Sequence, residues 1–176
     1  LLTRAGPLAD GALHNDVLKA CATAAAPEAA LDVVETMDRR GLVADAVGVT
    51  SLLTAAARAG RAVPEAFARF DALDAPDVAA FNAAISLADR AGDQRLAMAY
   101  FRALAEHGAL APDATSFCAA IAACERSDAP KWRTALALLK GSLQALDAPD
   151  AACYVATMQT LVAAKELDRA LKLLDD

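Results

Sequence analysis

The sequence predicts an all-α protein, a right-handed superhelical α-solenoid of about five helix-turn-helix repeats. An aspartate recurs at spacings of 32 to 37 residues, at Asp10, Asp45, Asp77, Asp113 and Asp150. A second column follows four residues after each aspartate and consists of His14, Val49, Phe81, Phe117 and Tyr154. The composition is 57% hydrophobic but only 5% aromatic, which is typical of thin helices that pack closely. This periodicity indicates stacked hairpins, none of which can bury its apolar face alone.

The recurring aspartates also set the expected repeat boundaries. We predict the end of a preceding repeat at 1–10, followed by repeats at 11–45, 46–77, 78–113, 114–150 and 151–176, the last of them incomplete. The sequence begins without a methionine and ends inside an apolar periodic pattern. We therefore expect it to be a segment of a longer protein.

Each repeat is expected to hold two helices, because apolar residues recur every three or four positions in two separate stretches. The first helices are predicted at 13–24, 47–59, from Val78 to a turn at Arg90, 115–126 and 152–164. The second helices are predicted at 27–40, 64–73, from Leu96 to a turn at His107, 130–146 and from Glu166 onward. Prolines at the start of second helices (Pro27, Pro64, Pro130) and glycines after helix ends (Gly41, Gly60, Gly92) support these limits.

Charge and motifs argue against several classes of function. The net charge of −6 and the pI of about 4.9 count against strong non-specific binding to nucleic acid, although they allow a local basic track. No apolar run reaches the length of about 18 residues that a membrane-spanning helix needs. The four cysteines form no CxxC pair and lie far in sequence from both histidines, so no metal site is expected. Catalytic motifs are absent, so we expect no enzyme, no cofactor and no small-molecule substrate.

The third repeat carries a recognisable set of motifs. Phe81-Asn82, Ala91-Gly92, Ala97-Met98, Gly108 and Pro112-Asp113 occur in this order. In these residues, and over nearly the whole chain, the sequence resembles the pentatricopeptide repeat family. The nearest rival is the tetratricopeptide repeat, whose Trp-x2-Leu-Gly signature is missing. The resemblance implies a non-enzymatic protein that binds single-stranded RNA in a mitochondrion or chloroplast and supports transcript processing, stability or translation.

Members of this family read one RNA base per repeat through two or three side chains. The main readers are the residue after the early aromatic position and the last residue of the repeat. The resemblance assigns the pairs Asn15 with Asp45, Thr50 with Asp77, Asn82 with Asp113 and Cys118 with Asp150, and it makes Val155 the first half of a fifth pair. The family code reads Asn/Asp as uracil and Thr/Asp as guanine, so the first three pairs predict U-G-U.

Two further columns bear on RNA binding. In the family, the residue two positions before the early aromatic wedges between bases. The corresponding residues here are Ala12, Val47, Ala79, Thr115 and Ala152, of which only Val47 is a branched aliphatic. Arg58, Arg90 and Arg126 recur near the ends of the first helices, where guanidinium groups could follow a phosphate backbone.

Simpler interpretations exist for both columns of charged residues. Each aspartate could serve only as the N-cap of a first helix. Each arginine could only complement the dipole at a helix C-terminus. The chain could then be a structural scaffold subunit of a large organellar assembly such as a ribosome, binding protein and RNA through the solenoid surface. The acidic net charge and the small wedge residues favour this alternative.

Overall fold

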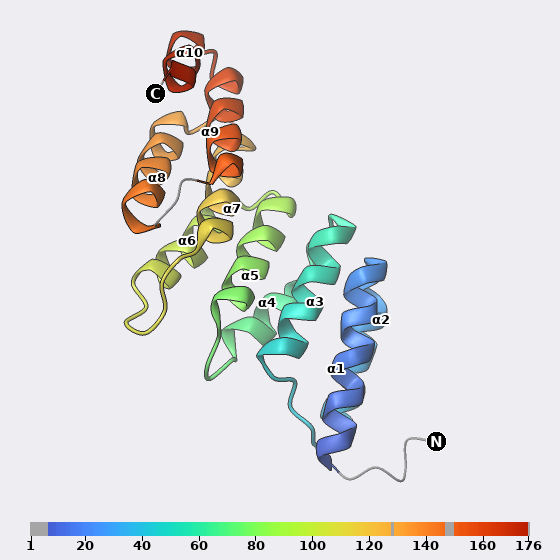
Figure 1. Cartoon of the computed structure of the whole chain (residues 1–176). Helices are drawn as coiled ribbons and strands as arrows, with labels where there is room; N and C mark the ends of the chain where they lie inside the picture. The colour runs from blue at the N-terminus through green and yellow to red at the C-terminus, as the bar shows by residue number, and fades with distance from the viewer. Residues whose placement is uncertain (1–6, 128, 147–149, 176) are drawn as a thin grey trace. The chain divides into compact units, whose positions relative to one another are not determined.

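The computed structural model describes residues 7–127, 129–146 and 150–175, and all regular secondary structure in these ranges is α-helical (Figure 1). This confirms the predicted all-α class. The helices fall into two compact units, Leu1–Ala91 and Gly92–Asp176, which are described one at a time. Within the described ranges, no helix combines the length and the apolar character needed to cross a bilayer. The right-handed superhelix and the repeat boundaries stay predictions.

The first unit consists of two layers of helices. Its helices are α1 (Pro7–Ala24), α2 (Pro27–Arg39), α3 (Ala46–Ala59), α4 (Pro64–Asp71) and α5 (Val78–Arg90). The helices α1, α3 and α5 pack side by side, while α2 packs against α1 and α3, and α4 packs against α3 and α5 (Figure 1). The first helices of successive repeats therefore form one layer, and the second helices form the other.

The second unit has the same plan. Its helices are α6 (Gln94–Ala105), α7 (Ala114–Glu125), α8 (Trp132–Ala145), α9 (Ala151–Ala163) and α10 (Leu167–Asp175). The first helices α7 and α9 pack side by side. The second helices cover them, with α6 against α7, α8 against both α7 and α9, and α10 against α9.

The early aromatic position fixes how a first helix sits on the preceding second helix. In the first unit, the ring of Phe81 in α5 meets the ring of Phe70 in α4 edge to face, with centroids 5.1 Å apart. In the second unit, Phe117 in α7 meets Phe101 in α6 in the same way at 5.3 Å. Such pairs contribute about 0.5–1.5 kcal/mol beyond the burial of their area. Elsewhere the buried faces of α3 and α5 are rich in alanine, which lets these helices approach closely.

The recurring aspartates cap the first helices, so the structural role considered for them is confirmed for the four whose side chains are described. Asp45, Asp77 and Asp113 each accept a hydrogen bond from the backbone N–H three residues later, at 2.9, 2.7 and 2.8 Å. Asp150 differs, because it accepts from Ala152, two residues later, at 2.8 Å.

Two predicted helix starts are wrong. The first helix begins at Pro7 and not near residue 13, which places Asp10 inside α1 and not at its N-cap. A proline is well tolerated in the first turn, so Pro7 suits this start. The helix predicted from Pro130 begins at Trp132, because the chain first returns to α7, where the Lys131 N–H donates to the Cys124 carbonyl at 3.0 Å.

Four of the turns between paired helices contain a residue with left-handed backbone. Gly60 and Gly92 adopt it with φ of 66° and 82°. Ala25 and Lys165 adopt it in the turns α1–α2 and α9–α10 with φ of 52° and 62°. For a residue with a side chain this conformation costs roughly 1–2 kcal/mol. The turns at Ala25 and Lys165 are therefore strained, while the turns at Gly60 and Gly92 are not.

Candidate nucleic-acid interface

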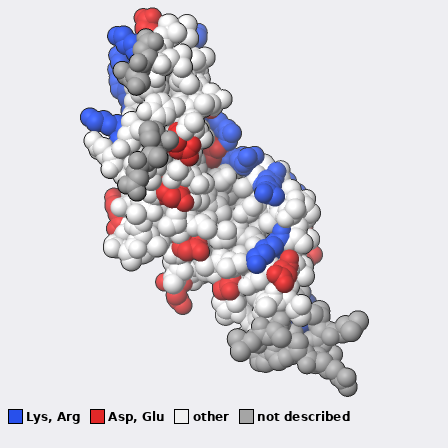
Figure 2. Space-filling model, in the orientation of Figure 1, with Lys and Arg blue, Asp and Glu red and all other residues white. Residues whose placement is uncertain are grey.

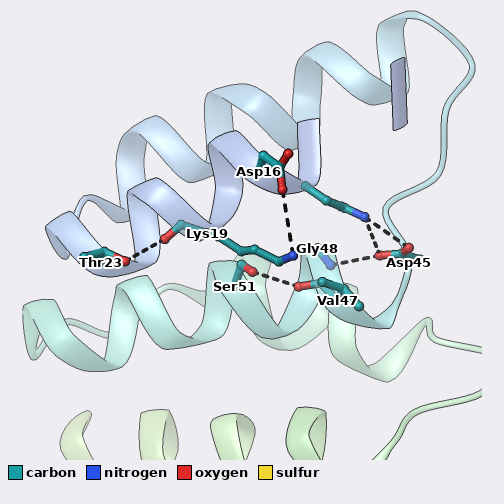
Figure 3. A network of polar contacts seen from close by, with 8 residues as sticks. Asp16, Lys19, Thr23, Asp45, Val47, Gly48 and Ser51 are labelled. Atoms are coloured by element: carbon teal, nitrogen blue, oxygen red, sulfur yellow. Dashed lines mark hydrogen bonds and ion pairs between the residues drawn. The ribbon is translucent and has the colours of Figure 1, made fainter. Parts of the chain in front are cut away.

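The first predicted reading pair is joined by hydrogen bonds. Asn15 lies on α1 and Asp45 caps α3, the helix packed beside it. The Asn15 Nδ2 donates to both carboxylate oxygens of Asp45, at 3.3 and 3.2 Å, and the Gly48 N–H donates to Oδ1 at 2.9 Å (Figure 3). The carboxylate is thus fixed by two helices and in turn orients the amide. The carboxylate stays exposed, while Asn15 is half-buried.

Gly48 makes room for this amide. A Cβ at Gly48 would lie 3.0 Å from Asn15 Oδ1 and 3.2 Å from a methyl carbon of Leu18, closer than most side chains tolerate. The Asn15 Oδ1 is shielded from solvent and has no hydrogen-bond partner among the described residues. The position three residues after the capping aspartate therefore lies beneath the reading pair.

The reading pair opens onto a hollow of the first unit. The hollow has a volume of about 370 Å³ and is lined by Gly11, Ala12, Asn15, Met37, Leu42, Val43 and Asp45. The structure therefore brings the predicted wedge residue Ala12 to the same place as both predicted readers. Val43, which is 87% exposed, also borders the hollow and is not among the predicted site residues. The sequence carries no distinct signal for it, because its neighbours Leu42 and Ala44 are apolar as well.

In the second and third predicted pairs, the second residue is again an aspartate that caps a first helix. Thr50 is half-buried on α3, and its hydroxyl oxygen is shielded and has no hydrogen-bond partner in the described part of the chain. Its predicted partner Asp77 is exposed at the start of α5, the helix beside α3. Asn82 is half-buried on α5 in the first unit, and the exposed Asp113 caps α7 in the second unit.

The predicted wedge positions all lie at the surface, near the starts of the first helices. Ala12, Val47, Ala79, Thr115 and Ala152 are exposed. Val47 is 43% exposed although it is apolar, which suits contact with the face of a base. The other four side chains offer little area for such a contact. Val155, the first half of the fifth pair, is 48% exposed on α9.

The predicted phosphate contacts lie at the opposite ends of the first helices. Arg58 and Arg90 lie in the last turns of α3 and α5, Arg126 follows α7, and all three are exposed. Arg58 also has a structural role, because its Nη1 donates to the Ala22 carbonyl near the end of α1 at 3.3 Å. Figure 2 shows acidic and basic side chains on the drawn face with uncharged surface between them.

Comparison with known proteins identifies the repeats. A family model described as "Pentatricopeptide repeat-containing protein" matches residues 9–104, which is more than half of the chain. The chain belongs to the pentatricopeptide repeat family. Two solved structures are similar to it: the pentatricopeptide repeat protein PPR10 in complex with an 18-nt psaJ RNA element, and a cysteine-to-serine variant of PPR10 with the same RNA element. No curated protein sequence matches the chain.

Both structural similarities extend over most of the chain. Each has a TM-score of 0.76 at 26% identity and covers 94% of this chain but only 24% of PPR10. The chain therefore spans about a quarter of the length of that protein. Together with the helix packing inside each unit, this similarity confirms an α-solenoid of pentatricopeptide repeats.

The fourth reading position departs from the other pentatricopeptide pairs of this chain. Cys118 on α7 and Asp150 at the start of α9 lie close together, and Cys153 of α9 joins them within 4.8 Å. Burial raises the pKa of the Cys118 thiol. Burial and a hydrogen bond with Cys118 raise the pKa of the Cys153 thiol, which also donates to the Ala114 carbonyl at 3.7 Å. Both thiols are therefore protonated at neutral pH.

Neither Cys153 nor this cluster is among the sites that the sequence predicts. The four cysteines form no local metal-binding motif along the sequence. Within each unit, however, first helices of successive repeats lie side by side, so residues about one repeat apart become neighbours. The signal that could have found the cluster is the separation of Cys118 and Cys153, which is 35 residues and thus about one repeat.

Proposed function

We propose that this chain binds single-stranded RNA with one base per repeat and catalyses no reaction. The observation that carries the proposal is the hydrogen-bonded pair of Asn15 and Asp45, which lines a hollow together with the wedge residue Ala12. The similarity to PPR10 structures that contain RNA supports it.

The chemistry of the pair suits the edge of a base. Uracil presents one N–H donor between two carbonyl acceptors, and a carboxylate is a strong acceptor for such a donor. The amide of Asn15 is held at the carboxylate of Asp45. Because both side chains are already ordered, RNA binding loses less conformational entropy. By the family code this pair selects uracil, Thr50 with Asp77 selects guanine, and Asn82 with Asp113 selects uracil.

The charges of the chain predict selective binding with little non-specific attraction. Arg58, Arg90 and Arg126 are the candidate phosphate contacts, while the net charge is −6. A location in a mitochondrion or chloroplast, with a role in transcript processing, stability or translation, is part of the proposal and rests on the family alone.

A second candidate is a scaffold subunit of a large organellar assembly. The same net charge favours it, because an acidic surface repels RNA outside the reading pairs. In that case the solenoid surface holds proteins, and co-purification returns a fixed set of proteins that survives nuclease treatment.

A binding measurement distinguishes the two. We expect the chain to bind an RNA with a U-G-U core more tightly than a scrambled RNA in fluorescence anisotropy titrations. Asp45→Asn should reduce this preference, because the carboxylate acceptor is lost while asparagine still caps α3. Asp93→Asn is the matched control, since Asp93 caps the second helix α6 by accepting from the Leu96 N–H at 2.9 Å and is not a reader. Equal affinity for both RNAs, falling steeply with salt, contradicts the proposal.

A further inference from the structure

A cluster of metal-ligating atoms lies in the second unit, where α7 and α9 pack together. The Sγ atoms of Cys118 and Cys153 and a carboxylate oxygen of Asp150 all lie within 4.8 Å of one another. Cys118 comes from α7, Cys153 from the first turn of α9, and Asp150 is the residue that caps α9. Helix packing therefore assembles three ligands from two repeats without any local sequence motif.

The ligand set suits a thiophilic cation. Zn²⁺ binds cysteine thiolates at about 2.3 Å and often has three protein ligands and one water in a tetrahedral site. Two thiolates on such an ion lie roughly 3.8 Å apart. The two Sγ atoms lie within 4.8 Å of each other in the structure, so they need to approach by at most about 1 Å to reach this separation. Ca²⁺ and Mg²⁺ prefer oxygen ligands and do not match two sulfurs.

The surroundings leave these ligands available. Asp150 uses Oδ1 to accept the Ala152 N–H at 2.8 Å, and its other oxygen remains for a cation. Cys153 is fully buried, whereas Cys118 and Asp150 are half-buried. The solvent-accessible members of the cluster are therefore Cys118 and Asp150, through which a cation would have to reach it. Neither Cys118 nor Cys153 forms a disulfide in the structure, so no S–S bond competes for these two sulfurs.

We propose that Cys118, Cys153 and Asp150 bind one zinc-class divalent cation, with one coordination position open to water. Binding replaces the protons of the two thiols, which pass to the solvent, and no group is oxidised or reduced. The site lies at the fourth reading position, so the inference rests on the proposed function in one respect. A bound cation occupies Cys118 and Asp150 and thereby removes them from base reading.

The test is a titration of the RNA-free chain with Co²⁺, under a phosphine reductant that keeps the thiols reduced. We expect one Co²⁺ per chain, with a thiolate-to-cobalt charge-transfer absorption that Zn²⁺ abolishes by displacement. Cys118→Ser should leave at most the absorption of the single Cys153 thiolate and weaken binding at least about tenfold. Asp150→Asn should weaken binding by a similar factor while asparagine still caps α9.

Matched controls are available in the same chain. Cys124 lies on α7 and Cys21 lies in the first unit, and both are buried away from the cluster, so Cys124→Ser and Cys21→Ser should leave the titration unchanged. Cys118→Ser is the decisive variant because this side chain is only half-buried. Circular dichroism should show that the variant stays helical. No thiolate absorption in the wild type, or full absorption in Cys118→Ser, overturns the inference. Neither result bears on RNA binding, which is measured separately.

Discussion

The reading positions of the two units share one framework and differ in chemistry. In the first unit, Asn15 of a first helix meets Asp45, which caps the next first helix. In the second unit, Cys118 meets Asp150 in the same arrangement. The framework comes from helix packing and N-capping, which do not depend on the residue opposite the aspartate. The place of each predicted reader is thus set by the fold, while the chemistry of its side chain can differ.

The residue three positions after the capping aspartate explains much of this difference. In the first unit it is Gly48, which leaves space for the amide of Asn15 and donates its N–H to Asp45. In the second unit it is Cys153, whose side chain fills that place with a second thiol. The cap bond of Asp150 then goes to Ala152 instead. The residue at this one buried position therefore determines whether the site is suited to a base or to a cation.

The largest effect is expected when the residues beside Asp150 in the second unit are changed to resemble those beside Asp45 in the first unit. The double variant Cys118→Asn with Cys153→Ala replaces both thiols, and alanine already occupies the equivalent buried position at Ala80. We expect cobalt binding to be lost. We also expect a new preference for uracil at the fourth base, worth about 1–3 kcal/mol as for other base-specific contacts. Anisotropy titrations with four RNAs that differ at this base measure the preference. Equal affinity for all four would show that the helix packing and the capping aspartate do not by themselves create a base-reading pair.

A smaller effect is expected in the turns, where the units can be compared by reciprocal substitutions. Ala25→Gly and Lys165→Gly should each stabilise the protein by about 1 kcal/mol, because both residues have positive φ. Gly60→Ala and Gly92→Ala should each destabilise it by about the same amount, since only φ, and no neighbouring atom, opposes a Cβ there. Urea denaturation measures all four changes. A loss of stability in Ala25→Gly contradicts the strain assigned to that turn.

Features that depend on local chemistry could be predicted from the sequence. Asp45 and Asp77 cap helices because a short acceptor before an apolar stripe does so in any context. The prediction that Asn15 and Asp45 belong together needed the family resemblance, and the structure then showed their hydrogen bonds.

The remaining features depend on contacts that sequence spacing does not reveal. Helix α1 extends back to Pro7 although Asp10 resembles the other capping aspartates. Val43 borders the reading hollow because of the path of a connection, not because of a periodic pattern. Cys153 meets Cys118 only through the packing of α9 on α7. In each case the deciding partner belongs to another segment of the chain.

The most direct test of base reading is a change of code at the first pair. Asn15→Thr turns the pair into the Thr/Asp combination found at Thr50 and Asp77. Anisotropy titrations with four RNAs that differ only at the first base should show the preference moving from uracil in the wild type to guanine in the variant. A uniform loss of affinity for all four RNAs, with no change in their order, contradicts the assignment of Asn15 and Asp45 as readers.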